Sequence, residues 1–128
     1  MHDRASGTST GTFTGHTGAA RSVTVSPDGT WLATTDAQGT LRTWDRASGA
    51  CTLTVAAYDA GPVAVAPDGA RLATTDAQGT LRIWDRATER VATLMRVDGP
   101  LHSCLWAPDG RVVAAAGERG LYLFALRV

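Results

Sequence analysis

The stretch Leu32-Ala33-Thr34-Thr35-Asp36-Ala37-Gln38-Gly39-Thr40-Leu41-Arg42 decides the fold, because the same residues return unchanged from Leu72 to Arg82, 40 positions later. The similarity continues on both sides of this stretch. A Pro-Asp-Gly turn occurs at 27–29, 67–69 and 108–110, and a Trp-Asp-Arg-Ala segment occurs at 44–47 and 84–87. Self-similarity with a period of about 40 residues indicates a repeat protein whose units stack on one another.

Each copy has the pattern of four short strands separated by turns. In the first copy the predicted strands cover 22–25, 31–35, 40–44 and 51–55, and polar and apolar residues alternate along the first of them. The turn Pro27-Asp28-Gly29 follows that strand, with a proline that presets φ and a glycine that closes the turn. No helical spacing of apolar residues is sustained in the unit. The pattern predicts an all-β fold.

Short motifs within the copies resemble the WD-repeat β-propeller family. They are Gly15-His16, Ser26-Pro27-Asp28-Gly29 and the Trp-Asp pairs at 44–45 and 84–85, while the worn third copy has Phe124-Ala125 in place of Trp-Asp. The resemblance implies that each unit of about 40 residues is one four-stranded antiparallel blade. The expected architecture is a β-propeller segment of three blades.

The buried hydrogen-bond network of that family is incomplete in this sequence. In the family, the network joins the Gly-His histidine, a Ser or Thr on the second strand, an Asp in the next turn and the signature Trp. The resemblance implies structural roles for His16, Trp44 and Trp84. However, Gln38 and Gln78 replace the turn aspartate, and an aspartate stands where Ser or Thr is usual. We therefore expect a rearranged network.

The predicted repeats begin with an unpaired fourth strand at one end of the chain and lack a fourth strand at the other end. Residues 8–14 align as a lone fourth strand, followed by blade one at 15–55, blade two at 56–95 and blade three at 96–128, which lacks its fourth strand. In the family, a strand with this offset closes the ring. Three interpretations stay open. They are head-to-tail assembly of two or three copies into a ring of six or nine blades, membership of a larger propeller, and an open three-blade segment.

Composition argues against several classes of protein. The formal net charge is zero, with 12 basic and 12 acidic residues, so no nucleic-acid partner is expected. No apolar run approaches the length of a membrane span, and the N-terminus lacks a signal-peptide pattern, so no membrane partner is expected. The cysteines Cys51 and Cys104 indicate free thiols, small core side chains and a cytoplasmic location. All basic residues are Arg, which is typical of a GC-rich bacterial gene.

Side chains for catalysis, metal binding or a cofactor do not form a recognisable motif. Cys51 and Cys104 lack companions at metal-ligand spacing, and the chain has no Gly-x-Ser-x-Gly, phosphate-binding or zincin motif. Asp36 and Asp76 lie at equivalent points of neighbouring blades, so we expect them to cap turns or line the channel and not to flank one scissile bond. We expect no enzyme activity, no cofactor and no metal.

The expected function is a non-catalytic scaffold that binds a protein or peptide. Propeller blades form a rigid body, while the loops on its two faces vary freely. The alternative is a ligand-sensing or scaffold appendage of a larger bacterial signalling protein. From the register of the repeats, we expect the partner-binding face to carry Arg21, Asp36, Tyr58, Asp59, Asp76, Asp98 and His102.

Overall fold

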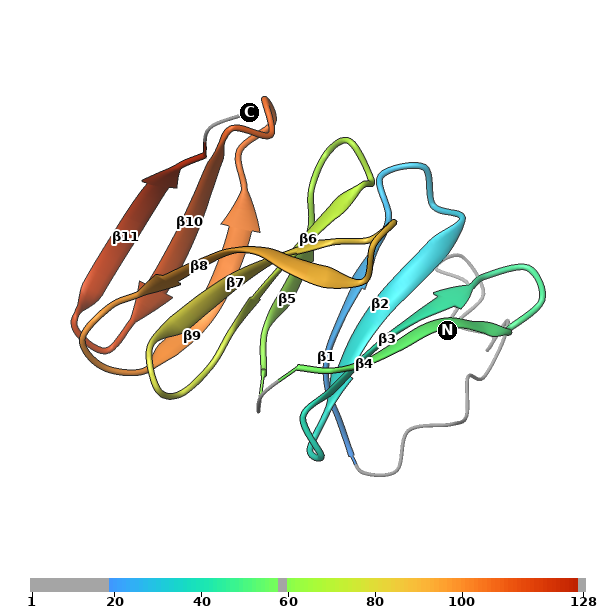
Figure 1. Ribbon diagram of the computed structural model, residues 1–128, viewed down its shortest axis with the longest axis horizontal. Helices are drawn as coiled ribbons and strands as arrows, with labels where there is room; N and C mark the ends of the chain where they lie inside the picture. The colour runs from blue at the N-terminus through green and yellow to red at the C-terminus, as the bar shows by residue number, and fades with distance from the viewer. Residues whose placement is uncertain (1–18, 58–59, 127–128) are drawn as a thin grey trace, which may run out of the picture.

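The computed structural model describes residues 19–57 and 60–126, and every regular element in them is a β-strand (Figure 1). The first sheet contains β1 (Ala20–Val25), β2 (Trp31–Asp36), β3 (Thr40–Asp45) and β4 (Cys51–Ala56). The second contains β5 (Val63–Val65), β6 (Arg71–Thr75), β7 (Thr80–Asp85) and β8 (Arg90–Arg96). The third contains β9 (Leu101–Trp106), β10 (Val112–Gly117) and β11 (Gly120–Ala125). The predicted all-β class with three sheets is confirmed.

Within each sheet the strands follow the order of the chain. All neighbours pair antiparallel, in the orders β1-β2-β3-β4, β5-β6-β7-β8 and β9-β10-β11. Short turns with the Pro-Asp-Gly sequence allow each first strand to reverse directly into the second. The predicted lone strand at 8–14 lies outside the described residues, so its pairing with the third sheet stays a prediction.

The strand register repeats from sheet to sheet. The aromatic residue near the end of each third strand pairs with a branched apolar residue on the second strand. These pairs are Trp44 with Leu32, Trp84 with Leu72, and Phe124 with Val113. Phe124 therefore has the structural position of the signature Trp, as the alignment of the diverged third copy predicted. Below, we call the three sheets blade one, blade two and blade three.

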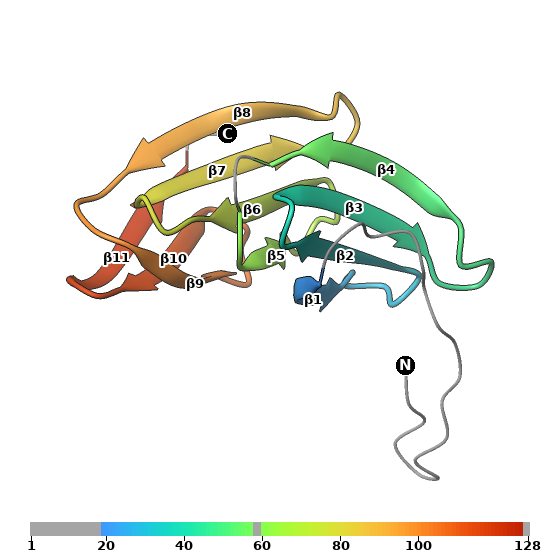
Figure 2. The ribbon, with the colours of Figure 1, turned by 90° about the horizontal axis from the view of Figure 1, so that it is seen from below.

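The blades lie side by side, with β1, β5 and β9 along one edge of the row and β4 and β8 along the opposite edge (Figure 2). Strand β5 contacts β1 and β2 of blade one, and β9 contacts β5 and β6 of blade two. This stacking through the first strands is the arrangement of neighbouring propeller blades. Among the described residues, blade one and blade three each have one face without a neighbouring sheet.

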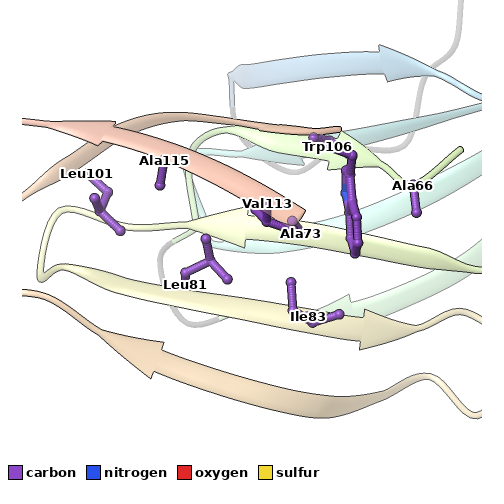
Figure 3. Packing of buried hydrophobic residues seen from close by; sticks show 9 residues of the cluster. Ala66, Ala73, Leu81, Ile83, Leu101, Trp106, Val113 and Ala115 are labelled. Carbon is purple, nitrogen blue, oxygen red and sulfur yellow. The ribbon is translucent and has the colours of Figure 1, made fainter. Parts of the chain in front are cut away.

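The core between blades two and three combines small side chains with large ones (Figure 3). Full burial of a Leu, Ile or Val stabilises a fold by about 1.5–3 kcal/mol, so this packing holds the two blades in one arrangement. The buried members of the core are Ala64, Ala66, Ala73, Leu81, Ile83, Leu101, Trp106, Val113 and Ala115.

A second core joins blades one and two. Trp31 and Leu41 of blade one pack with Val63 and Trp84 of blade two. At the rim of this junction, the Arg86 guanidinium lies over the Trp31 ring, 3.9 Å from the ring centroid. A cation–π contact of this kind contributes about 0.5–1 kcal/mol at an exposed site. Neighbouring blades are therefore joined by apolar packing in the centre and by a stacked arginine at the edge.

Candidate functional site

Two residues of the predicted partner-binding face, Asp36 and Asp76, are buried at the ends of the second strands, Asp36 as the last residue of β2 and Asp76 directly after β6. The Asp36 carboxylate accepts hydrogen bonds from the backbone N–H groups of Gln38 (2.9 Å) and Thr40 (3.0 Å). Asp76 caps the equivalent turn and forms a 3.0 Å ion pair with Arg82. A buried carboxylate is costly unless partners of this kind satisfy it. This geometry supports turn capping more than partner contact.

The signature tryptophans have a hydrogen-bond partner that the sequence analysis did not identify. Indole Nε1–H groups of Trp44 and Trp84 donate to the hydroxyl oxygens of Thr34 and Thr74, each at 2.9 Å. These threonines lie ten residues before the Trp. The family resemblance instead implies a Ser or Thr eight residues before the Trp, where this chain has Asp36 and Asp76. The third residue with a predicted structural role, His16, lies outside the described residues.

Two exposed pairs of polar side chains, one of them an Arg–Asp ion pair, form a charged cluster beside blade three. Nε2 of His102 on β9 lies 3.8 Å from Oε1 of Glu118, and Nη1 of Arg119 lies 3.7 Å from Oδ2 of Asp98. Asp98 belongs to the loop before β9, while Glu118 and Arg119 form the turn between β10 and β11. Sequence reasoning selected Asp98 and His102 but missed the two turn residues. Their proximity depends on how the loop packs beside the β10–β11 hairpin, which no local motif records.

The remaining predicted face residues are not part of that cluster. Arg21 is exposed on β1 of blade one, where the pairing with β2 shifts register between Ala20 and Ser22. Tyr58 and Asp59 lie outside the described residues. The structure thus brings Asp98 and His102 together through their ion-pair partners and places Arg21 on a separate blade.

A hollow of about 490 Å³ lies between blades one and two, at the outer strand of blade one. Of the predicted face residues, the five that the structure describes do not line it. Its charged lining side chains are Asp68, Arg86 and Glu89, and Leu53 supplies an apolar wall. A hollow of this character can receive a polar or charged side chain of a partner. Sequence reasoning missed it because its walls come from two different repeats.

The two cysteines differ in their surroundings. Cys51 is exposed on β4, so the expectation that both thiols are small core side chains was wrong for this residue. Cys104 faces blade two, where its Sγ–H donates to the Ala73 carbonyl oxygen at 3.7 Å, and burial raises the pKa of this thiol to about 12. His102 is exposed nearby on the same strand but pairs with Glu118, so the geometry does not join it to Cys104 as a base to a nucleophile.

Residues 19–57 and 60–126 contain no group of three or more His, Cys, Asp or Glu side chains that could hold a metal ion. In the same part of the chain, no helix has the length and apolar character needed to cross a membrane. Two polar features of the described surface are the charged cluster of blade three and the hollow between blades one and two.

Comparison with known families identifies the repeats. The family described as "WD domain, G-beta repeat" matches residues 7–45 and 49–85, which is more than half of the chain. The chain belongs to the WD-repeat family. Each matched segment ends at the last residue of a third strand, Asp45 of β3 or Asp85 of β7.

One curated relative is similar to a single repeat. It is the ribosome biogenesis protein erb1 of Botryotinia fuckeliana (strain B05.10), which is 49% identical over 37 residues. The match covers 29% of this chain and 5% of that protein. The chain thus corresponds to a small part of the length of this relative, and the likeness concerns the repeat itself.

Proposed function

We propose that this chain is a non-catalytic scaffold that binds a protein or peptide partner. The observation that carries the proposal is the exposed charged cluster of Asp98, His102, Glu118 and Arg119 on a WD-repeat frame. Loops on rigid blades present side chains without a large ordering cost, and charges of both signs give specificity for a partner with complementary charges. The cluster therefore suits recognition of a peptide that carries both acidic and basic groups.

The exposed members of the predicted face are the ones that support this function. Arg21, Asp98 and His102 are exposed and available for contact. Tyr58 and Asp59 precede blade two in the chain as Asp98 precedes blade three, and they remain candidates on that basis. The two buried aspartates of the set contribute by holding the turns.

A triple replacement tests the proposed face. Arg21→Ala, Tyr58→Ala and His102→Ala together should weaken binding of a peptide, selected against the wild-type chain from a display library, by at least about tenfold. The matched control replaces Arg90 and Arg111, which are exposed on β8 and in the turn before β10, and should retain wild-type affinity. Circular dichroism checks that both variants are folded. An unchanged affinity in the folded triple variant would contradict the proposed face.

We also propose that copies of the chain assemble head-to-tail into a closed ring of two or three copies. The support is a set of large exposed apolar side chains, since such side chains mark interaction surfaces. They are Val23 and Val25 on β1, Leu105 on β9, and Leu121 and Leu123 on β11. Light scattering coupled to gel filtration over a concentration series tests this. A discrete dimer or trimer of the 13.3 kDa chain supports the ring, whereas a monomer at every concentration contradicts it.

A scaffold or ligand-sensing part of a larger protein is the second candidate. It is favoured by the erb1 relative, in which the matched segment is only 5% of the protein. In that arrangement, further blades would cover the apolar flanks and the isolated chain would not form a discrete ring. The same light-scattering measurement separates the two candidates. A cytoplasmic location belongs to both proposals and rests on the free thiols.

A further inference from the structure

The internal junctions show which side chains of a blade face the blade after it. On β7, Leu81 and Ile83 are buried in the core shared with blade three. On β5, the carbonyl oxygen of Ala64 accepts a hydrogen bond from Nε1 of Trp106 on β9 at 3.2 Å. Together these positions form the surface that a blade presents to the next blade. We call this surface the trailing face.

The trailing face of blade three also presents apolar side chains. Leu121 and Leu123 have the register of Leu81 and Ile83, because Phe124 aligns with the signature Trp84. They are 70% and 68% exposed. Leu105 precedes Trp106 as Ala64 precedes Val65 in the matching register of β9 and β5, and it is 62% exposed. The third trailing face is therefore apolar and exposed.

The opposite surface of a blade, the leading face, is defined in the same way. Val63 and Val65 of β5 pack against blade one, and Cys104 and Trp106 of β9 pack against blade two. Their counterparts at 23 and 25 on β1 are valines that are 63% and 50% exposed. The neighbouring Ser22 side chain faces the other way, since its Oγ accepts a hydrogen bond from Val63 N at 3.2 Å. Blade one thus has an exposed apolar leading face.

We infer that the trailing face of blade three binds the leading face of blade one from a second copy of this chain, with Leu105 against Val25 of that copy. This inference rests on the proposed ring assembly and specifies its contact. It follows from the positions of Ala64 and Trp106, which share the core between blades two and three. One blade further on, the same positions hold Leu105 and, in the second copy, Val25. The indole–carbonyl hydrogen bond has no counterpart there, because Val25 has no side-chain donor. The contact is heterologous, so each copy uses both faces, and repeated contacts of this kind form a ring when the rotation between copies closes.

Side-chain volume supports a second copy as the occupant. The core between blades two and three combines a small residue, Ala64, with a large one, Trp106, whereas the inferred contact combines the larger Leu105 with the smaller Val25. Interiors are closely packed, so a larger residue on one side needs a smaller one on the other. A tryptophan at position 25, as its counterpart position 106 has, would be too large for the space beside Leu105.

The charges at the rim of the junction agree with this pairing. Arg71 of blade two lies over the Trp106 ring, 4.9 Å from its centroid, and donates to the Gly110 carbonyl oxygen at 2.8 Å. The corresponding position of blade three is Val112, at the start of β10. A valine there suits Val25, which has no aromatic face for a cation. Both inferred faces therefore have apolar valine side chains at the positions where Arg71 and the Trp106 ring meet in the internal junction.

Charge introduction followed by mixing tests the contact. The variants V25R and L105D should each shift from the mass of the wild-type assembly toward that of the monomer, with a dissociation constant at least about tenfold higher. The reason is that each variant places one unpaired charge in both junctions of a two-copy ring. An equimolar mixture should regain a discrete assembly containing both variants. One junction then has the wild-type pair and the other an Arg–Asp pair. Light scattering and native mass spectrometry read the masses.

The control is Leu94→Asp, because Leu94 is 48% exposed on the outer strand β8 and belongs to neither face. It should leave the mass unchanged, and circular dichroism should show all variants folded. If the wild-type chain assembles but V25R and L105D keep its mass, or if it forms a dimer and the mixture of the variants stays dissociated, the contact is wrong while the ring survives. Loss of assembly in only one variant would indicate a symmetric like-to-like contact and would overturn the inference. If the wild-type chain is monomeric at every concentration, the ring proposal itself is wrong. The exposed apolar faces of blades one and three would then be covered by blades of a larger protein.

Discussion

At the scale of single residues, hydrogen bonding and burial set the charge state of side chains in opposite directions. The Asp28 carboxylate in the first Pro-Asp-Gly turn accepts bonds from the Ser26 hydroxyl (2.7 Å), the Thr30 hydroxyl (2.7 Å) and the Thr30 N–H (3.0 Å). These bonds stabilise the ionised form and lower the pKa of Asp28 to about 2. Burial of Cys104 disfavours its thiolate and raises the pKa of that thiol to about 12.

The two thiols should therefore differ in reactivity. At pH 8, Cys51 should react with a thiol reagent such as iodoacetamide, whereas Cys104 should stay unmodified in the folded chain. The reason is that the thiolate is the nucleophile, and a group whose pKa is raised remains protonated until the pH approaches that value. Mass spectrometry of the peptides gives the extent of labelling. Both thiols should react in urea, and rapid labelling of Cys104 without urea would contradict its burial.

At the scale of elements, the turn between β6 and β7 also anchors the loop before blade three. Gly79 has a φ of +88°, and its carbonyl oxygen accepts a hydrogen bond from Val97 N at 2.8 Å. A Cβ at this position would lie 2.4 Å from the Val97 carbonyl oxygen and 2.5 Å from that of Gly99. The turn thus requires glycine both for its backbone conformation and for the close approach of a neighbouring loop.

Replacement of Gly79 by Ala should accordingly destabilise the chain more than replacement of Gly69. Gly69 also has a positive φ, +71°, but its Cβ direction is open. We expect Gly69→Ala to cost about 1–2 kcal/mol from the left-handed conformation, and Gly79→Ala to cost at least about 1 kcal/mol more from the clash. Urea denaturation followed by tryptophan fluorescence measures the difference. Equal decreases in the free energy of unfolding for the two variants would contradict this, because they would show that the loop before blade three can move away from the added methyl group without loss of stability.

At the scale of the whole molecule, stability should differ between the middle and the end of the row. Strand β7 pairs with β6 and β8, whereas β11 pairs only with β10 among the described residues. Both faces of blade two are packed, but the trailing face of blade three is exposed. Local opening is easiest where backbone hydrogen bonds and apolar contacts are few.

Hydrogen exchange measured by mass spectrometry should show this gradient. At concentrations where the chain is monomeric, amides of β11 should exchange faster than those of β7, because one edge of β11 is open to water. Assembly should slow the exchange of β11 more than that of β7. If β11 is as protected as β7 at every concentration, another strand covers its edge. Residues 8–14 would then be the segment to examine.

Local sequence patterns were sufficient to predict the class of fold. Alternation over 22–25 and the Pro-Asp-Gly turns predicted strands that the structure has at β1 and the elements that follow it. The identical stretches at 32–42 and 72–82 predicted equivalent strands and turns in blades one and two. These features depend on neighbours within a few residues, so a single sequence contains the information.

The sequence by itself therefore determined the repeat, the four-strand unit and the WD-repeat family, because strand alternation and turn chemistry act over short distances. Only the tertiary structure decided that Asp36 is buried, that Thr34 receives the Trp44 N–H, and that Glu118 and Arg119 complete a charged cluster with His102 and Asp98. It also decided which apolar side chains are exposed on the flanks. Those properties depend on how separate strands and blades pack, and sheet packing brings together residues that no local spacing relates.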